Sequence, residues 1–507
     1  MQEKIQKRQV FINAIMSIGQ VIVVSGIFFI LYRFLLETIG AEQLGIWSVV
    51  LAMTSVAGIA NLGLSGSVVK FVAKYVARGE DKNIAGVIQT AIISIGVFVG
   101  LILLIAYPFV SWMLDLVMPS SSFKEGLSIL PYALISLWIM TFFSILQSGL
   151  DGYQKIDIRS VIFMIGALFH LILAFILVPS YGLMGLAYAR VIQSIVLLIG
   201  SWFVIKRFIP GLPVLPYRWD RKLFREMIGY GLNFQVISIT QMLCDPTTKA
   251  LLSKFGGLSM VGFYEMANRL ILQLRALIVN ANQVLVPTIA DLQERNPNLI
   301  QNVYKDNYRL MFYIALPFYS IIIAFTPFIS EIWIGHYEHT FVIFSILLAV
   351  NLFINTLSVP SYFSYLGIGE LKWNTLGHVI TAIMNAILGF TVGYIFGGTG
   401  VVIAWVFSSI TGSLMIVISY HYRYKIPLRE LLPRESAGLV IACLTATAFA
   451  LLIYCQASHN FTIIITISMA ILAFSIIVFI PFWHHPMRKR LMGWIINDLL
   501  NKKQGIQ

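Results

Sequence analysis

Asp245 and Lys249 are charged residues inside an apolar stretch, 229–252, that is long enough to cross a bilayer. Their spacing of four residues lets the two side chains neutralise each other on one face of a helix. Pro246 cannot donate to the carbonyl four residues earlier, so we expect the helix to bend or open there, and open backbone inside a membrane is tolerated mainly beside a cavity. Asp245 is therefore a candidate carboxylate for cation coupling or gating, and Lys249 a candidate substrate contact. A plain ion pair between them is the alternative.

The apolar stretch 262–288 carries a stripe of polar side chains. Asn268, Arg275 and Asn282 recur every seven residues, so consecutive members lie within about 20° of each other around a helix. At 1.5 Å per residue the stripe extends over roughly 21 Å. We therefore predict that these three side chains face one polar space inside the membrane.

The two arginines of this stretch differ in their neighbours. Arg269 follows Glu265 by four residues, whereas Arg275 has no acidic residue three or four positions away. An arginine without a partner on its own helix suits an anionic group, above all phosphate, because its planar fork donates two parallel hydrogen bonds. Arg275 and Arg269 are therefore candidate substrate-binding residues, together with Asn268 and Asn282. For Arg275, a bridge to Asp245 is the alternative.

The first half of the sequence carries fewer charges in its apolar stretches. Asn61 is an amide in the stretch 44–65, and such amides more often hold helices together than bind ligands. Lys70, Lys74 and Arg78 are spaced by four and form a basic helix face that could receive a diphosphate head group, although attraction to anionic lipid explains it equally well. Asn61 and Lys70 complete the candidate substrate-binding set.

The composition requires a membrane to surround these residues. Of 507 residues 58% are hydrophobic and only 11% are charged, which leaves room for roughly 14 spans of ~20 apolar residues and excludes a soluble enzyme. The net charge of +13 is scattered through short loops rather than gathered on one face, so no nucleic-acid partner is expected. The three cysteines match neither a metal site nor a disulfide framework. No cofactor, metal or catalytic residue is predicted.

The apolar runs predict about fourteen transmembrane helices in an all-α integral membrane protein. They fall near 10–32, 44–65, 84–106, 127–150, 159–178, 183–205, 229–252, 262–288, 308–330, 340–366, 374–396, 399–420, 437–456 and 461–482. With the N-terminus in the cytoplasm, 28 of the 35 Lys and Arg residues fall in inward segments and three in outward connections. This bias predicts a multi-pass protein of a bacterial or archaeal cytoplasmic membrane with both termini cytoplasmic.

Three pairs of glycines suggest an internal repeat. Gly40-x4-Gly45 and Gly257-x4-Gly262, each followed by an apolar and an aromatic residue, are 217 residues apart. Gly152 with Lys155 matches Gly369 with Lys372 at the same offset, and Gly182-x2-Gly185 matches Gly397-x2-Gly400 at 215. Matches in one order at nearly one offset indicate a duplicated unit of six spans.

An even number of spans per unit means that both units enter the membrane from the same side. The repeat therefore predicts two six-helix lobes related by an axis along the membrane normal, with two further C-terminal helices, an arrangement suited to alternating access. The predicted divisions are an N-terminal lobe (1–205), a cytoplasmic linker (206–226), a C-terminal lobe (227–422), helices 13 and 14 (423–482) and a cytoplasmic basic amphipathic tail (483–507).

These residues resemble the polysaccharide transporters, including O-antigen-type flippases, of the multidrug/oligosaccharidyl-lipid/polysaccharide (MOP) superfamily. The resemblance covers nearly the whole chain. It rests on Gly40-x4-Gly45-Ile46-Trp47 with Asn61-Leu62-Gly63-Leu64, on Asp245 with Lys249, on Val261-Gly262-Phe263-Tyr264 with Ala267 and Arg269-Leu270, and on Gly182-x2-Gly185. It implies a MATE-like flippase fold whose central cavity is lined by spans one, two, seven and eight. It also likens spans thirteen and fourteen to the lipid-tail groove of glycolipid members.

The function implied by the resemblance is not enzymatic. It is a flippase that moves an undecaprenyl-diphosphate-linked oligosaccharide across the cytoplasmic membrane for surface polysaccharide biosynthesis. Its partners would be the lipid-linked glycan and membrane lipids, with glycan assembly enzymes as further candidates; neither the oligomeric state nor the coupling ion is predicted. One alternative is a multidrug cation antiporter of the same superfamily, although the unpaired charges here are cationic. The other is a membrane glycan polymerase or ligase, which would need larger outward loops.

Overall fold

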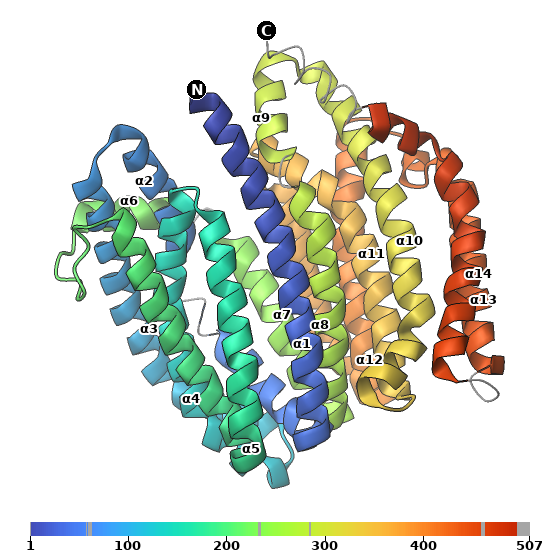
Figure 1. The fold of residues 1–507 in the computed structure, drawn as a ribbon, viewed down its shortest axis with the longest axis horizontal. Coiled ribbons are helices and arrows are strands. Elements are labelled where there is room, and N and C mark those ends of the chain that lie inside the picture. The colour runs from blue at the N-terminus through green and yellow to red at the C-terminus, as the bar shows by residue number, and fades with distance from the viewer. Residues whose placement is uncertain are drawn as a thin grey trace. The chain divides into compact units, whose positions relative to one another are not determined.

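Every regular element in the described part of the chain is a helix (Figure 1). The computed structural model describes residues 2–56, 58, 63–231, 235–282, 285–457 and 462–493. Nine helices within these residues are long and apolar enough to cross a bilayer. The prediction of an all-α, multi-pass membrane protein is confirmed, whereas the count of about fourteen spans stays a prediction.

Fourteen α-helices and three short 3-10 helices make up the described fold. The α-helices are α1 (Gln2–Ser55), α2 (Leu64–Arg78), α3 (Asp81–Val117), α4 (Ser120–Gly152), α5 (Ile156–Phe208), α6 (Arg221–Gly231), α7 (Gln235–Gly256), α8 (Leu258–Ala281), α9 (Leu285–Arg295), α10 (Ile300–Ile334), α11 (His339–Ile368), α12 (Lys372–Arg423), α13 (Ala437–Ala457) and α14 (Ile463–His484). The 3-10 helices are η4 (Pro297–Leu299), η5 (Leu428–Leu431) and η6 (Arg434–Ser436).

Three helices are far longer than one crossing of a bilayer requires, and each bends at a glycine. Helices α1, α5 and α12 contain 54, 53 and 52 residues, against ~20 for one span. The bends lie at Gly40 (φ 81°), Gly182 (φ 54°) and Gly397 (φ 65°), where a positive φ favours a residue without a side chain. Each long helix therefore contains two of the predicted spans.

The bends confirm two of the three glycine matches. Gly257, with φ 82°, separates α7 from α8 as Gly40, with φ 81°, bends α1. Gly182 and Gly397 likewise bend α5 and α12. The same backbone conformation thus recurs at the spacing that the repeat predicts.

The third glycine match was wrong by two residues. The left-handed residue after α4 is Gln154 (φ 59°), and its counterpart after α11 is Gly369 (φ 84°). The structural counterpart of Gly152 is therefore Gly367. A Cβ added at Gly152 would lie 2.6 Å from α2, and one added at Gly367 would lie 2.9 Å from α9. Both glycines permit a close helix contact, and the offset at this point is 215.

The chain forms two compact units. The first comprises Met1–Met266 with Ala382–Trp405, and the second comprises Ala267–Thr381 with Val406–Gln507. In the first unit α1 packs on α4, α5 and α7; in the second α10 packs on α11 and α13. The lobes predicted from the repeat divide the chain differently and stay a prediction.

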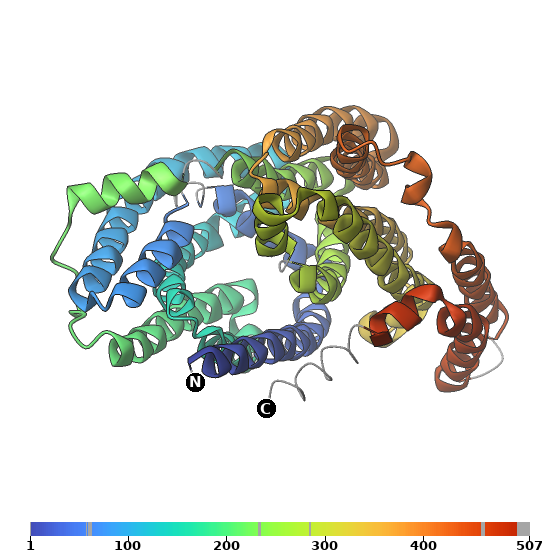
Figure 2. The ribbon, with the colours of Figure 1, turned by 90° about the horizontal axis from the view of Figure 1, so that it is seen from above.

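Helices α13 and α14 lie side by side and pack on α10 within the second unit (Figure 2). Their shared core contains the small residues Cys443, Ala446 and Ala470, all fully buried. Small side chains at such positions let membrane helices approach closely. Met487 is buried in the same core, so the start of the predicted tail contacts protein. Residues 494–507 of that tail lie outside the described residues.

The repeat is also visible as a reciprocal contact within the first unit. A Cβ added at Gly45 of α1 would lie 1.9 Å from the carbonyl oxygen of Leu258. A Cβ added at Gly262 of α8 would lie 2.3 Å from the carbonyl oxygen of Ala41. Because Ala41 and Gly45 stand 217 residues before Leu258 and Gly262, the two repeats contact each other through equivalent residues.

We expect Gly45→Ala to destabilise the protein. The backbone of α8 leaves no room for a methyl group, and overpacking typically costs about 1–3 kcal/mol. The matched control is Gly26→Ala on the same helix, where an added Cβ meets nothing within 4 Å and the better helix propensity of alanine can stabilise by roughly 0.5–1 kcal/mol. Thermal unfolding in detergent, followed by circular dichroism, should lower the melting temperature of the first variant only. Equal melting temperatures would contradict the contact.

Candidate functional site

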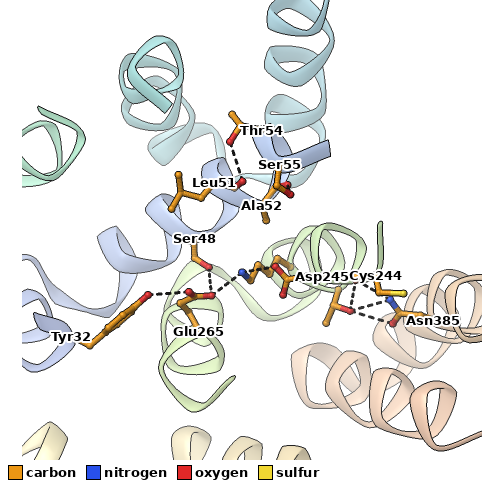
Figure 3. Close-up of polar contacts among 12 residues, drawn as sticks. Tyr32, Ser48, Leu51, Ala52, Thr54, Ser55, Cys244, Asp245, Glu265 and Asn385 are labelled. Carbon is orange, nitrogen blue, oxygen red and sulfur yellow. Dashed lines mark hydrogen bonds and ion pairs between the residues drawn. The ribbon is translucent and has the colours of Figure 1, made fainter. Parts of the chain in front are cut away.

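Lys249 is a buried lysine bound by two carboxylates (Figure 3). Its Nζ lies 2.7 Å from Oδ2 of Asp245 on the same helix and 2.8 Å from Oε2 of Glu265 on α8. The side chains of Lys249 and Glu265 are 6% and 4% exposed, whereas that of Asp245 is 44% exposed. With all three groups ionised the cluster carries one net negative charge, and Asp245 is its accessible end.

Glu265 joins this cluster to both limbs of the bent helix α1. Its Oε1 accepts a hydrogen bond from Tyr32, before the bend, at 3.0 Å, and its Oε2 accepts one from Ser48, after the bend, at 3.1 Å (Figure 3). Several donors on one carboxylate stabilise its charged form away from water. Glu265 therefore holds α1, α7 and α8 together.

From the sequence, Glu265 is identified only as a neighbour of Arg269, and its role between the three helices is not predicted. A signal for it was present in the repeat. Ser48 and Glu265 are 217 residues apart, and they are equivalent positions of the two repeats that contact each other. Pairing each position of α1 with the residue 217 positions later, which is Glu265 for Ser48, would have placed Glu265 against α1.

Helix α12 contacts the same part of α7 through an amide. Asn385 donates from Nδ2 to Oγ1 of Thr248 at 3.0 Å and to the carbonyl of Cys244 at 3.2 Å (Figure 3). Thr248 and Asn385 are fully buried. Helix α7 remains helical through Pro246, so it does not open there, and a bend at Pro246 stays a prediction.

Arg275 of α8 lies in the second unit and binds an amide rather than a carboxylate. Its Nη2 donates to Oδ1 of Asn355 on α11 at 2.6 Å, and Asn355 in turn donates to Oγ of Ser413 on α12 at 3.0 Å. The Nε of Arg275 is buried without a hydrogen-bond partner. Within the described residues Arg275 forms no ion pair, and the ion pair of Asp245 is made with Lys249. The positive charge of Arg275 is therefore held in place without being neutralised by a carboxylate.

The remaining predicted site residues have diverse surroundings. Asn282 is buried, donates to the carbonyl of Ile278 and to the sulfur of Met311, and accepts from Asn307 at 2.8 Å, so it holds α8 against α10. Asn268 and Arg269 are half-buried on α8, and Lys70 is exposed on α2. Asn61 lies outside the described residues. The structure brings Asp245 and Lys249 together, whereas a binding role for any of these residues stays a prediction.

Comparison with known proteins shows which family the chain belongs to. The model of a family described as "Polysaccharide biosynthesis protein" matches residues 30–342, which is more than half of the chain. The chain belongs to this family. A curated protein of Shigella flexneri named "Putative O-antigen transporter" is 23% identical over 394 residues, covering 76% of this chain and 91% of that protein.

Solved structures of the MOP superfamily share the fold. A structure described as lipid II flippase MurJ in an inward closed conformation matches with a TM-score of 0.69 and 16% identity, covering 92% of this chain and 98% of that chain. An inward-facing multidrug resistance MATE family transporter of the MOP superfamily matches with a TM-score of 0.68 and 15% identity, covering 80% and 94%. The expected MATE-like flippase fold is confirmed. These relatives are transporters and flippases, in agreement with the prediction that the chain is not an enzyme.

We expect Lys249→Met to destabilise the protein strongly. The substitution leaves Glu265 and Asp245 without their shared cation, and breaking a buried ion pair from one side typically costs about 3–5 kcal/mol. The double variant Lys249→Met/Glu265→Gln removes the buried charge and keeps acceptors and donors for Tyr32 and Ser48, so it should recover part of the loss.

The control is Lys254→Met, which removes a lysine from an exposed position on the same helix. Thermal unfolding in detergent measures all three variants. A melting temperature of Lys249→Met equal to that of Lys254→Met would show that the cluster does not hold the three helices together.

Proposed function

We propose that this protein is a flippase that carries an undecaprenyl-diphosphate-linked oligosaccharide across the cytoplasmic membrane by alternating access. Membership of the polysaccharide biosynthesis family, the O-antigen transporter relative and the lipid II flippase fold support a lipid-linked glycan as the substrate. On this proposal the sugars and diphosphate pass through a polar path while the polyprenyl tail remains in lipid.

The observation that carries the proposal is the environment of Arg275. A charge inside a bilayer costs at least ~2.5–3.5 kcal/mol, so it marks a functional site when no carboxylate compensates it. The guanidinium is held by the neutral amide of Asn355. A diphosphate that reaches it would gain charge-assisted hydrogen bonds without displacing a competing anion. Arg269, Asn268 and Lys70 are the further proposed substrate contacts.

Asp245, Lys249 and Glu265 are proposed to couple or gate transport. The cluster has one negative charge in excess, and the excess is accessible at Asp245. A proton or a metal cation that neutralises Asp245 would weaken its hold on Lys249 and leave Glu265 as the main partner of that lysine. Because Glu265 also binds both limbs of α1, such a change would reach the bend at Gly40.

The topology completes the proposal. Lobes 1–205 and 227–422 would rock about the substrate path, joined by a cytoplasmic linker, with both termini in the cytoplasm. The inside-negative membrane potential would then favour export of the anionic head group by ~2.3 kcal/mol per charge per 100 mV. Helices α13 and α14 would accompany the polyprenyl tail.

We expect Arg275→Ala to lose glycolipid translocation. A hydrogen bond to a charged group is worth about 1.5–3 kcal/mol, so transport should slow by roughly 10- to 100-fold, and Arg275→Lys should recover only part because lysine lacks the planar fork. The measurement uses liposomes containing the purified protein and a fluorescent undecaprenyl-diphosphate oligosaccharide, with translocation detected by a membrane-impermeant quencher.

The matched control is Arg33→Ala, since Arg33 is exposed and pairs with Glu37 four residues later, where loss of the pair costs about 0–1 kcal/mol. Wild-type transport by Arg275→Ala would remove Arg275 from the site. Dye efflux from the same liposomes with unchanged glycolipid sidedness would instead support a cation antiporter.

A further inference from the structure

A polar cavity of about 370 Å³ lies in the second unit, away from the residues proposed for transport. It is formed by α10 and by the connector from α12 to α13, which contains η5 and η6. Its lining consists of Arg309, Arg429, Glu430, Pro433, Arg434 and Glu435. We call this cavity the connector pocket. Its volume suits a small polar head group.

The two carboxylates of the connector pocket are turned toward one of its arginines. Arg309 on α10 donates from Nη2 to Oε2 of Glu430 at 2.8 Å, and its Nε lies 3.7 Å from Oε1 of Glu435. The three side chains are only 20–25% exposed. This inner group fixes the connector on α10: Glu430 is hydrogen-bonded to Arg309, whereas Glu435 is attracted to it without a hydrogen bond.

Arg429 and Arg434 are the exposed cations of the connector pocket. Within the described residues neither forms a hydrogen bond or a salt bridge, and the only electrostatic partner of Arg429 there is its neighbour Glu430. Three arginines against two glutamates leave the lining with one net positive charge. Two exposed guanidinium groups on the rim of one cavity favour an oxyanion that accepts several hydrogen bonds, for which phosphate is the common biological case.

The connector also carries two exposed hydrophobic side chains. Leu428 and Leu432 are 58% and 55% exposed. Leu428 directly precedes Arg429, and Leu432 directly precedes Pro433. The connector leads into α13 at Ala437, within an apolar stretch, Leu428–Ala457, that is long enough to cross a bilayer. We therefore expect the connector to lie at the edge of the bilayer. Exposed leucines next to exposed arginines are typical of a segment whose apolar groups reach acyl chains while its cations reach phosphates.

We propose that the connector pocket binds the phosphate group of an anionic membrane phospholipid through Arg429 and Arg434, with Leu428 and Leu432 against its acyl chains. The site would fasten the α12–α13 connector, and with it the α13–α14 pair, to the lipid surface. It is independent of the transported substrate, because none of its residues belongs to the proposed transport site. The same phosphate chemistry is offered by free phosphate, and the leucines are what select the lipid.

The test measures lipid binding to the full chain purified in detergent. Native mass spectrometry should show a phosphatidylglycerol molecule that resists washing from the wild type, whereas phosphatidylcholine, which has no net charge, should not replace it. The variant Arg429→Gln/Arg434→Gln should need roughly thirty-fold more phosphatidylglycerol for equal occupancy of this site, from the worth of two basic residues near an anionic surface.

The matched control is Arg218→Gln/Arg221→Gln, which removes the same charge from exposed positions of the first unit and should leave the occupancy unchanged. Circular dichroism checks that both variants keep their helix content. Equal weakening in the two double variants, or none in the first, would overturn the site.

A second pair of measurements separates lipid from free phosphate. Leu428→Ser/Leu432→Ser should weaken phosphatidylglycerol binding. In the wild type, inorganic phosphate at millimolar concentration should compete poorly with the lipid. Displacement of the lipid by inorganic phosphate at equal concentration would overturn the lipid assignment. Loss of glycolipid transport by Arg275→Ala bears only on the proposed function, so the two hypotheses can fail separately.

Discussion

The cost of an ionised side chain inside a bilayer is the constraint on which this structure depends. Glu265 satisfies it by binding Lys249, Tyr32 and Ser48 at once, so a single carboxylate connects α8 to α7 and to both limbs of α1. Removing any of these partners leaves polar atoms in a place that water does not reach. Hydrogen bonds and an ion pair thus add to helix packing in the first unit, where lipid competes with apolar contacts between helices.

The duplication of the chain explains where this interaction occurs. Equivalent residues of two repeats related by a local two-fold axis meet close to that axis, and Ser48 with Glu265 is such a pair. The reciprocal contacts of Gly45 and Gly262 with the opposite backbone lie beside it. The glycines permit close approach of the two helices, and of the two equivalent positions one carries a neutral hydroxyl and the other a carboxylate.

Local features of the structure could be predicted from the sequence, and long-range ones could not. The bends at Gly40, Gly182 and Gly397 follow from a residue type that alone accepts their backbone conformation. The pairing of Asp245 with Lys249 follows from helix geometry. The hydroxyl partners of Glu265 are 217 and 233 residues away, and periodicity on one helix carries no information about them. Only the offset of the repeat points to one of them, Ser48.

The polar stripe on α8 and the third glycine match show the same limit. A spacing of seven residues places Asn268, Arg275 and Asn282 on one face, but it does not tell which helix covers that face. Asn282 packs against α10, whereas Arg275 contacts α11. At the third match, the two glycines Gly152 and Gly369 are paired in the sequence because they are the same residue type. The left-handed conformation of Gly369 is instead matched by Gln154, which the sequence does not reveal.

The contrast between Lys249 and Arg275 separates two tasks that a transporter must perform. An anion approaching Lys249 has to displace two carboxylates from a cluster that is already negative, so on the proposed function this lysine would respond to cations at Asp245 rather than to a phosphate. An anion approaching Arg275 meets one neutral amide, which it can replace or share. On the proposed function, substrate recognition at Arg275 and cation coupling at Asp245 would therefore reside in different side chains, so that neutralising Asp245 leaves the charge of the always protonated Arg275 unchanged.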